Sequence, residues 1–587
     1  MPLTPLTSPL GVKRAAHLLR RTCLGGSRSE IDVFASLTPT EAVQQLFSTE
    51  LPALELPINP DPGNEDLDIT RVFLSWHLGQ MLGAGVENNI KLPFILRERL
   101  VFFFHTHFTT KRSKVRSWEA LFYQQALFRL YAFDQEDIVL PPENPDAEPD
   151  DPASMETIVP KNFKELTKKL SVDNAMLIFL DGRYNVKGSP NENYARELLE
   201  LYSIGRGLEG NVPPPEFDGD YFVFTEEDVQ AGARVLSGYE TDDTFTTIDE
   251  ETGIPKGRVR GNETNASQHD NDPKTFSARL GGATIAPDTD LLNGTAPTEE
   301  SLLDEISQFV DLIYDQDATP VAICREIYRF FVYHDVTVEL QNDIIQDLAD
   351  VFIANEFKIQ PVLEALFTST HFYEAEAGAD DNNFGCIIKS PLDLVLGFVR
   401  NFAIPIPDYG TDLQGFYDFT GNLLGAMGDQ GMNYYEPFEV AGYSAYHQFP
   451  IFNRSWITPN YLANRYNLIQ ASISADSNLE MGQVDIVLFV QNNFADVAPN
   501  ARDLIVAIAQ YLLPVSENLT FDADTGELTV ERLNYFMSAF LFSPQIDPDP
   551  EASWTTRWNN GIDPTTVANQ LANLFNAMLQ SPEYQLM

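Results

Sequence analysis

The sequence has few basic residues for its length of 587. It holds 38 Lys and Arg residues against 86 Asp and Glu residues, which gives a formal net charge of −48 at pH 7. A surface of this charge repels the phosphates of nucleic acids and the anionic headgroups of membranes. We therefore exclude nucleic acid as a partner and expect no membrane insertion.

Cysteines and long apolar runs are also scarce. The three cysteines, Cys23, Cys324 and Cys386, form neither a C-x-x-C pair nor the even-numbered set of a disulfide-stabilised domain. No apolar run reaches the ~18 residues that a membrane-spanning helix needs, and the N-terminus lacks the apolar core of a signal peptide. Redox and zinc–thiolate chemistry are therefore not expected, and the sequence as written predicts a cytoplasmic protein.

Several familiar catalytic motifs are missing as well. The sequence has no G-x-S-x-G nucleophile elbow, no phosphate-binding Gly loop and no dinucleotide fingerprint. The stretch "GARVLSG" places its serine between the wrong neighbours for an elbow. Serine hydrolase, nucleotide-dependent and nicotinamide-dependent functions are therefore not expected.

Helical periodicity, in contrast, recurs through most of the chain. Examples are "LPFILRERLVFFFHTHF", "EEDVQAGARVLSGY" and "PVAICREIYRFFVYH". Strand signals are few, and the clearest is an alternating segment with a Thr-Gly turn at 519–530. We predict a mostly α, multi-helical globular protein with long irregular loops and at most a few short strands, including one hairpin near 519–530.

The same patterns divide the chain into four regions. A segment rich in Pro, Asp and Glu has little apolar material to bury, so we expect it to be dispensable for folding. A long polar loop without periodicity is of a length that is usually functional or disordered. The predicted regions are 1–133, an N-terminal helical region with a His-Thr-His motif; 134–160, the acidic Pro-rich insertion; 161–470, a helical core with the polar loop 240–298; and 471–587, a C-terminal helical region with the hairpin.

One predicted helix carries polar residues along a single edge. Ser189 is a suitable N-cap and Gly205 a suitable stop for this helix. At about 100° per residue, four polar side chains fall in one narrow sector. They are Asn193, Arg196, Glu197 and Glu200. We interpret this edge as the wall of a polar site with Glu197, Arg196 and Asn193 as catalytic candidates, and a solvated helix face is the alternative.

Two histidine-containing stretches offer donors for a metal ion. His105 and His107 follow an apolar run that is expected to be buried, and His269 with Asp270 lies in the long polar loop. Glu200 sits three residues from another glutamate, and a cation would relieve the repulsion between them. These five residues predict a divalent metal such as Zn, Mn or Fe. Hydrogen-bonded core histidines and an Asp-rich turn are the structural alternatives.

A basic cluster, "KRSKVR", follows the histidines at 111–116. Ion pairs with neighbouring carboxylates are the interpretation we favour in so acidic a chain. A pocket for phosphate, sulfate or a carboxylate is the alternative, because the guanidinium group of arginine matches such anions.

Four stretches together resemble one known family. They are "AAHLLRR", "FFFHTHFTT", "NENYARELLELYSIG" with "FTEEDVQAGARVLSGY", and "HDNDPKTF". The chain resembles the mostly bacterial family named domain of unknown function 1800 (DUF1800). Where that family commonly has "NVAGWPGG", this chain reads "EVAGYSAYHQFP", with Tyr443 in place of the Trp.

The resemblance implies a predominantly helical protein and brings no established activity. Members of the family are often exported, so export is the alternative to the cytoplasmic location. They are also often encoded beside proteins similar to sulfatases and alkaline phosphatases. A sulfatase-like protein is therefore the partner that the resemblance implies.

Two functions from different classes follow from these residues. The first is a metal-dependent enzyme, hydrolytic or oxidative, in which the His, Glu and Asp residues converge in a helical core. The second is a non-catalytic helical scaffold or partner-binding protein, in which the same residues form a structural polar network. A carbohydrate-binding module that uses the aromatic residues ranks third, because abundant aromatics usually belong to the core.

Overall fold

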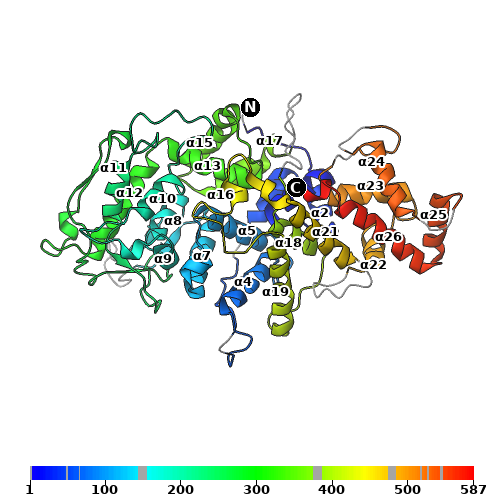
Figure 1. Ribbon diagram of the computed structural model, residues 1–587, viewed down its shortest axis with the longest axis horizontal. Coiled ribbons are helices and arrows are strands. Elements are labelled where there is room, and N and C mark those ends of the chain that lie inside the picture. The colour runs from blue at the N-terminus through cyan, green and yellow to red at the C-terminus, as the bar shows by residue number, and fades with distance from the viewer. Residues whose placement is uncertain are drawn as a thin grey trace.

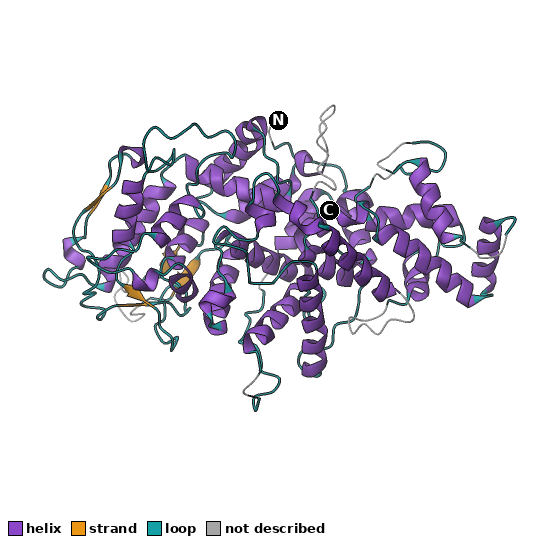
Figure 2. Ribbon diagram, in the orientation of Figure 1, coloured by secondary structure: helices purple, strands orange, loops and turns teal. Residues whose placement is uncertain are grey.

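The computed structural model describes residues 3–47, 51–64, 67–142, 155–373, 387–473, 484–515, 518–524, 528–542 and 547–587. Within these ranges helices dominate, and the named strands form three two-stranded antiparallel pairs at one end of the molecule (Figure 2). The prediction of a mostly α protein with few short strands is confirmed.

The molecule is elongated, with its helices in three groups along the long axis (Figure 1). At one end α8 to α12 carry the strands, α5 and α18 lie in the middle, and α23 to α26 form the other end. The first helices are α1 (Gly11–Cys23), α2 (Arg28–Ala35), α3 (Pro39–Phe47), α4 (Ile69–Met81), α5 (Lys91–His107), α6 (Arg112–Val115) and α7 (Trp118–Ala132).

The middle of the chain alternates helices with the short strands. Its elements are β1 (Ile138–Leu140), β2 (Thr157–Val159), α8 (Phe163–Leu170), α9 (Asn174–Phe179), α10 (Asn193–Glu200), α11 (Glu226–Val235), β3 (Tyr239–Glu240), β4 (Arg258–Val259), β5 (Lys274–Thr275), β6 (Thr284–Ile285), α12 (Glu299–Tyr314), α13 (Ala318–Phe331), α14 (Val338–Leu340), α15 (Gln346–Ala354), α16 (Ile359–Thr368) and α17 (Thr370–Tyr373).

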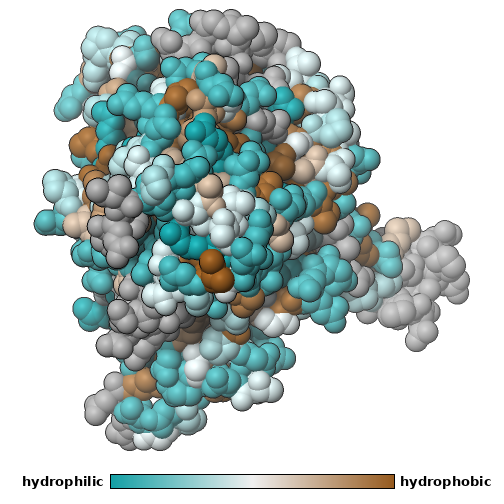
Figure 3. Space-filling model, turned by 90° about the vertical axis from the view of Figure 1, so that its right-hand side faces the viewer, coloured by the Kyte–Doolittle hydropathy of each residue, from teal (hydrophilic) through white to brown (hydrophobic). Residues whose placement is uncertain are grey.

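In the C-terminal part the described residues form helices and loops but no named strand. Its helices are α18 (Pro391–Asn401), α19 (Leu413–Asp429), α20 (Ser444–His447), α21 (Pro459–Ile473), α22 (Ile486–Asn493), α23 (Ala501–Leu512), α24 (Val530–Phe540), α25 (Pro550–Asn560) and α26 (Pro564–Leu579). Figure 3 looks at this end of the molecule, where hydrophilic side chains surround small apolar patches. Among the described residues, no helix is both long and apolar enough to cross a membrane.

Helix α5 is the central element of the core. Every residue from Pro93 to His107 is buried, and α1, α3, α4 and α7 pack around it. The run "LVFFF" is apolar on all sides of the helix, so no face can be left to water. Burial of this helix therefore places the His-Thr-His motif inside the protein.

The hairpin predicted at 519–530 is wrong for the residues described there. Residues 519–524, 528 and 529 form no strand, and α24 begins at Val530. The Thr529 side chain accepts a hydrogen bond from the backbone N–H of Arg532, so Thr529 is the N-cap of this helix. The described part of this run is therefore a loop that leads into the N-cap of α24, because threonine is common both in strands and at N-caps.

The predicted acidic insertion is anchored at its first residue. Asp134 is fully buried, and its carboxylate accepts hydrogen bonds from the backbone N–H groups of Ile359 (2.5 Å) and Gln360 (3.0 Å) at the start of α16. Strands β1 and β2 then pair, with Ile138 opposite Val159. Residues 143–154 lie outside the described part of the chain. These contacts argue against dispensability at Asp134, while the expectation for 134–160 as a whole and the four-region division stay predictions.

The cap from Asp134 gives a test of this anchoring. Asp134→Ala leaves two N–H groups at the start of α16 without an acceptor, and we expect it to lower the free energy of unfolding by about 1 to 3 kcal/mol. Urea unfolding followed by circular dichroism measures this loss. Glu136→Ala, at an exposed position nearby, is the control and should stay within about 0.5 kcal/mol of wild type. Equal stability of the two variants would contradict the anchoring role.

Candidate functional site

A polar cavity of about 240 Å³ lies where four parts of the chain meet. They are the C-terminal end of α5, the loop that follows α10, one face of α13 and the short helix α20. We call it the His107–His447 cavity. Its charged and imidazole side chains are His107, Glu200, Arg206, Glu209, Arg325, Glu326, Arg329 and His447.

Helix α13 supplies the longest wall of the cavity. Ala322, Arg325, Glu326 and Arg329 are spaced three, four and seven residues apart and therefore lie on one helix face. The remaining positions of α13 are mainly buried apolar residues such as Ile323. One polar stripe on an otherwise buried helix thus faces the cavity.

His107 presents a fixed tautomer to the cavity. Its Nε2 lies 3.0 Å from the carbonyl oxygen of Tyr202, and a carbonyl can only accept, so Nε2 carries the proton. Burial lowers the pKa of His107 to about 4, although the Tyr202 carbonyl and Glu326 favour the protonated ring. At neutral pH the ring is therefore uncharged, and its Nδ1 holds a lone pair.

His447 is held in the same way. Its Nε2 lies 2.9 Å from the carbonyl oxygen of Thr106, which as the second-last residue of α5 has no intrahelical partner for that carbonyl. Burial lowers the pKa of His447, so this ring is also neutral at pH 7. Neither Nδ1 forms a hydrogen bond with another described residue. The cavity therefore contains two neutral imidazoles whose Nδ1 atoms are left for a ligand.

The carboxylates of the cavity are already paired. Arg329 binds Glu209 (Nη1 to Oε1, 3.0 Å) and Glu326 (2.9 Å), and Arg206 binds Glu200 (2.6 Å). Burial opposes ionisation of Glu209, but the Arg329 guanidinium outweighs it and lowers the pKa of that carboxyl. Glu209 is therefore held in its ionised form, and all three glutamates are engaged in contacts with arginines.

Arg325 has an unused donor and, unlike Arg329, no short ion pair with a glutamate. Its Nη1 donates to Gln341 (2.8 Å), while its Nε has no hydrogen-bond partner although the residue is only 5% exposed. The nearest carboxylate oxygen, on Glu326, is 4.0 Å from that Nε. A buried guanidinium with an unused N–H favours an anionic or carbonyl oxygen as its partner.

His105 lies in a different environment from His107. Its ring stacks on Tyr435 with the ring centroids 3.7 Å apart, and neither ring nitrogen has a hydrogen-bond partner. Burial lowers the pKa of His105 to about 3. Side chains two residues apart on a helix diverge by about 200°, which explains why the motif splits between two places.

His269 and Asp270 belong to a third environment, next to α11 and α12. His269 Nδ1 lies 2.8 Å from the Ser237 carbonyl, and its Nε2 is 3.3 Å from the buried carboxylate of Glu305, which also pairs with Lys274. Asp270 forms an ion pair with Arg234 at 2.7 Å. These contacts tie the polar loop to the helices.

The predicted metal ligands are thus divided among three places. His107 and Glu200 share the cavity, whereas His105, His269 and Asp270 do not line it. Among the described residues, no three or more His, Cys, Asp or Glu side chains form a group that could hold a metal ion. A joint metal centre of all five residues has no support in this arrangement.

The helix predicted to start after Ser189 begins later, at Asn193. Ser189 instead forms an isolated antiparallel bridge with Val186, and the side chain of Asn191 accepts a hydrogen bond from the backbone N–H of Asn193 at 3.0 Å. Asn193 donates to the Leu180 carbonyl (3.1 Å), and Arg196 pairs with Glu226 (2.7 Å). Both residues therefore hold neighbouring segments in place.

Glu197 is buried, at 9% exposure, but has no cation of its own. Arg196 and Arg206 are paired with other carboxylates, Glu226 and Glu200. Burial and the neighbouring Glu200 raise the pKa of Glu197 to about 7. Glu197 is thus the buried member of the polar edge. Its surroundings favour the protonated, neutral carboxyl over the charged carboxylate.

The basic cluster after the histidines forms ion pairs. Lys111 contacts Glu436 at 3.2 Å, and Lys114 contacts Asp181 at 2.9 Å. The favoured interpretation is therefore confirmed for Lys111, Arg112 and Lys114, whereas Arg116 donates to the Ser113 carbonyl.

Sequence reasoning missed the α13 residues and His447. The polar stripe at 325, 326 and 329 could have been found, because its helical spacing interrupts an apolar pattern. His447 had no such signal, since only the fold brings it to Thr106, 341 residues away in the chain.

The fold and the cavity define a predominantly α-helical protein with a partly buried cavity of His, Arg and Glu side chains at the end of its central helix. Residues 17–586 match the family described as Protein of unknown function (DUF1800). The chain belongs to this family. Comparisons with curated proteins and with solved structures found no match.

The raised pKa of Glu197 predicts a pH-dependent gain on substitution. Between its ordinary pKa of 4.5 and about 7, the folded protein binds this proton more tightly than the unfolded chain does. Wild type therefore loses stability relative to Glu197→Gln as the pH rises through this range. We expect Glu197→Gln to be the more stable protein at pH 8 and to show no such gain at pH 4.5.

Urea unfolding at both pH values measures this difference. Glu263→Gln, at an exposed position, is the control and should show no pH-dependent gain. A Glu197→Gln variant that is less stable than wild type at pH 8 would show that the carboxylate has a cationic partner in the folded protein.

Proposed function

We propose that the chain is an enzyme that acts on a small polar substrate in the His107–His447 cavity. The observation that supports it most directly is the pair of imidazoles, each fixed through Nε2–H to a backbone carbonyl and each with Nδ1 unused. Such fixed neutral rings suit proton transfer or ligand binding better than a merely space-filling role.

Arg325 supplies the complementary binding group. Its guanidinium lines the cavity and has no short ion pair with a carboxylate, so it suits an anionic oxygen of the substrate. An anion placed there also raises the pKa of the nearby imidazoles, because an opposite charge stabilises the protonated ring. The His107 and His447 imidazoles would thus become stronger bases when the substrate binds. The reaction class that we favour is hydrolysis by a water molecule that an imidazole activates.

The roles proposed for residues on α10 follow from their contacts. Glu200 belongs to the cavity wall through its pair with Arg206. Asn193 and Arg196 act as positioning residues, because their side chains bind the Leu180 carbonyl and Glu226. Glu197 acts on this site through the charge of Glu200.

A divalent cation is a second candidate ligand. Metal-binding histidines usually donate their other ring N–H to a backbone carbonyl or a carboxylate, and His107 and His447 both do so. Zn, Mn and Fe bind imidazole nitrogen well. Because two imidazoles do not complete a coordination shell, water or substrate would fill the remaining positions.

An activity assay tests the enzymatic proposal. The substrates are 4-nitrophenyl esters of acetate, phosphate and sulfate, of which the last two carry an anionic group for Arg325. We expect His447→Gln to lower kcat/KM about 100-fold or more, as loss of a general base does. Arg325→Gln should mainly raise KM for the anionic esters, because it removes binding energy.

His334→Gln is the matched control, since this histidine packs on Phe452 and does not line the cavity. Thermal melting of each variant separates loss of function from loss of fold. Wild type that hydrolyses none of the esters, or full activity of folded His447→Gln, would favour the non-catalytic scaffold with a structural polar network.

Equilibrium dialysis against Zn²⁺, Mn²⁺ and Fe²⁺ tests the metal candidate. We expect about one ion per chain in wild type and none in His107→Gln/His447→Gln, because the substitutions remove both imidazole ligands. Equal metal content in the two proteins would contradict binding at this cavity.

A further inference from the structure

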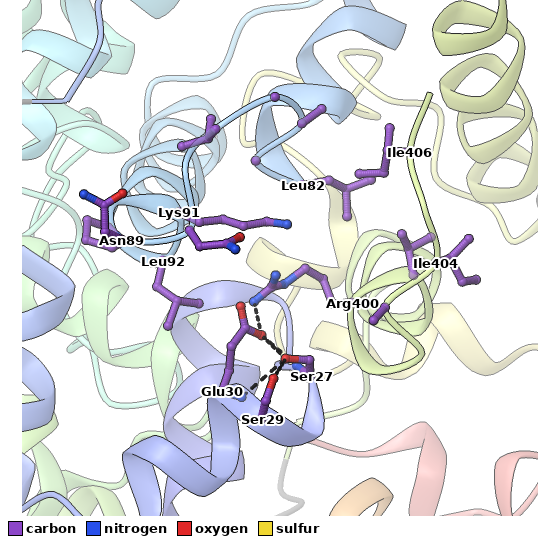
Figure 4. A pocket seen from close by; sticks show the side chains of 18 of the residues that line it. Ser27, Ser29, Glu30, Leu82, Asn89, Lys91, Leu92, Arg400, Ile404 and Ile406 are labelled. Atoms are coloured by element: carbon purple, nitrogen blue, oxygen red, sulfur yellow. Dashed lines mark hydrogen bonds and ion pairs between the residues drawn. The ribbon is translucent and has the colours of Figure 1, made fainter. Parts of the chain in front are cut away.

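A second cavity of about 760 Å³ lies at the other end of α5. It is formed by α2, the loop that leads into α5, and the C-terminal end of α18 (Figure 4). Lys91, the first residue of α5, lines it, while His107, the last residue, lines the polar cavity described above. At 1.5 Å per residue the two ends of the helix are about 24 Å apart, so the two sites are separate.

Lys91 extends into this cavity as a cation that no carboxylate of the described residues contacts directly, although the charge of Glu30 acts on it from within the same cavity. Its side chain points between Leu82 and Arg400 (Figure 4), and its amine forms no hydrogen bond or ion pair with a described residue. Burial and the positive charge of Arg400 lower the pKa of Lys91. An anion in the cavity would relieve both effects.

Arg400 is the second cation of the cavity. It is 6% exposed, and its Nη2 binds the Glu30 carboxylate (3.0 Å) and the Gly25 carbonyl (3.2 Å), while its Nε has no partner. Glu30 also accepts from the Ser27 backbone N–H (2.7 Å) as part of the α2 capping box. Two cations and one engaged carboxylate leave a net charge of one positive unit in the cavity.

The start of α5 adds to this positive potential. Its N-cap residue, Ile90, makes no side-chain capping bond, so the first backbone N–H groups of the helix have no side-chain acceptor there. The N-terminal end of a helix carries a partial positive charge. Helix end, Lys91 and Arg400 thus act in the same direction, within a chain whose net charge is −48.

One wall of the cavity is apolar, while Ser27, Ser29, Asn88 and Asn89 add polar groups elsewhere in the lining. Leu82, Ile404 and Ile406 lie together on the side toward which Lys91 extends (Figure 4), and Leu92 and Val399 also contribute. A volume of this size lies within the range of about 300 to 1,000 Å³ that is typical for small-molecule sites. The cavity therefore offers a cationic end and an apolar wall to one ligand.

We propose that this cavity binds a small amphiphilic carboxylate, with its head group at Lys91 and its hydrocarbon part against Leu82, Ile404 and Ile406. A carboxylate is favoured over a phosphate because the net charge of the cavity is one positive unit, which a monoanion neutralises. The apolar wall favours an alkyl or aromatic body over a purely polar anion.

Titration calorimetry with octanoate, 1-octanol and inorganic phosphate tests this assignment on the full chain. We expect octanoate to bind at one site and more tightly than the other two. Lys91→Gln should weaken its Kd at least about 10-fold, since a hydrogen bond to a charged group is lost. Lys91→Arg should retain binding because it keeps the charge.

Two controls make the outcome specific. Lys187→Gln, at an exposed position, and His447→Gln, in the other cavity, should bind octanoate as wild type does, whatever their activity. Equal affinity for octanol or phosphate, unchanged binding in folded Lys91→Gln, or loss of binding in His447→Gln would each overturn the proposal.

Discussion

The burial of α5 is the constraint on which the rest of the structure depends. A helix with no exposed face must have every charged side chain neutralised by a neighbour, because an unpaired buried charge is far more costly than a lost surface contact. Glu98 of α5 is therefore bound by Arg129 of α7 at 2.8 Å, and Arg99 by Asp393 of α18 at 2.8 Å. These pairs determine how the surrounding helices are placed against α5.

The two ends of the same helix explain where the cavities lie. Terminal N–H and carbonyl groups have no partner within a helix, so a buried helix needs polar neighbours at both ends. At the C-terminal end His447 donates to the Thr106 carbonyl. His447 and Arg325 both line the His107–His447 cavity. At the other end Lys91 and Arg400 face an open cavity. Because α5 is held on all sides, groups at either end are presented in a fixed geometry, as binding sites require.

Much of the local structure could be predicted from the sequence, and the predictions that were wrong share one cause. The helical periodicity, the buried run before His105 and the pairing of "KRSKVR" with carboxylates were correct. The start of α10 and the hairpin at 519–530 were wrong. The residues there, Ser and Asn before α10 and Thr and Asp before α24, suit caps, turns and bridges alike, so local chemistry alone leaves several conformations of similar energy.

The sequence by itself determined the charge of the surface, the helical class and which runs are buried, because these depend on residues close together in the chain. Only the tertiary structure decided which histidine acts with which partner. His105 and His107 are neighbours in sequence, yet one stacks on Tyr435 and the other shares a cavity with His447. The physical reason is that a helix directs adjacent side chains to different sides, while the groups that meet them come from segments whose approach is determined by packing of the whole core.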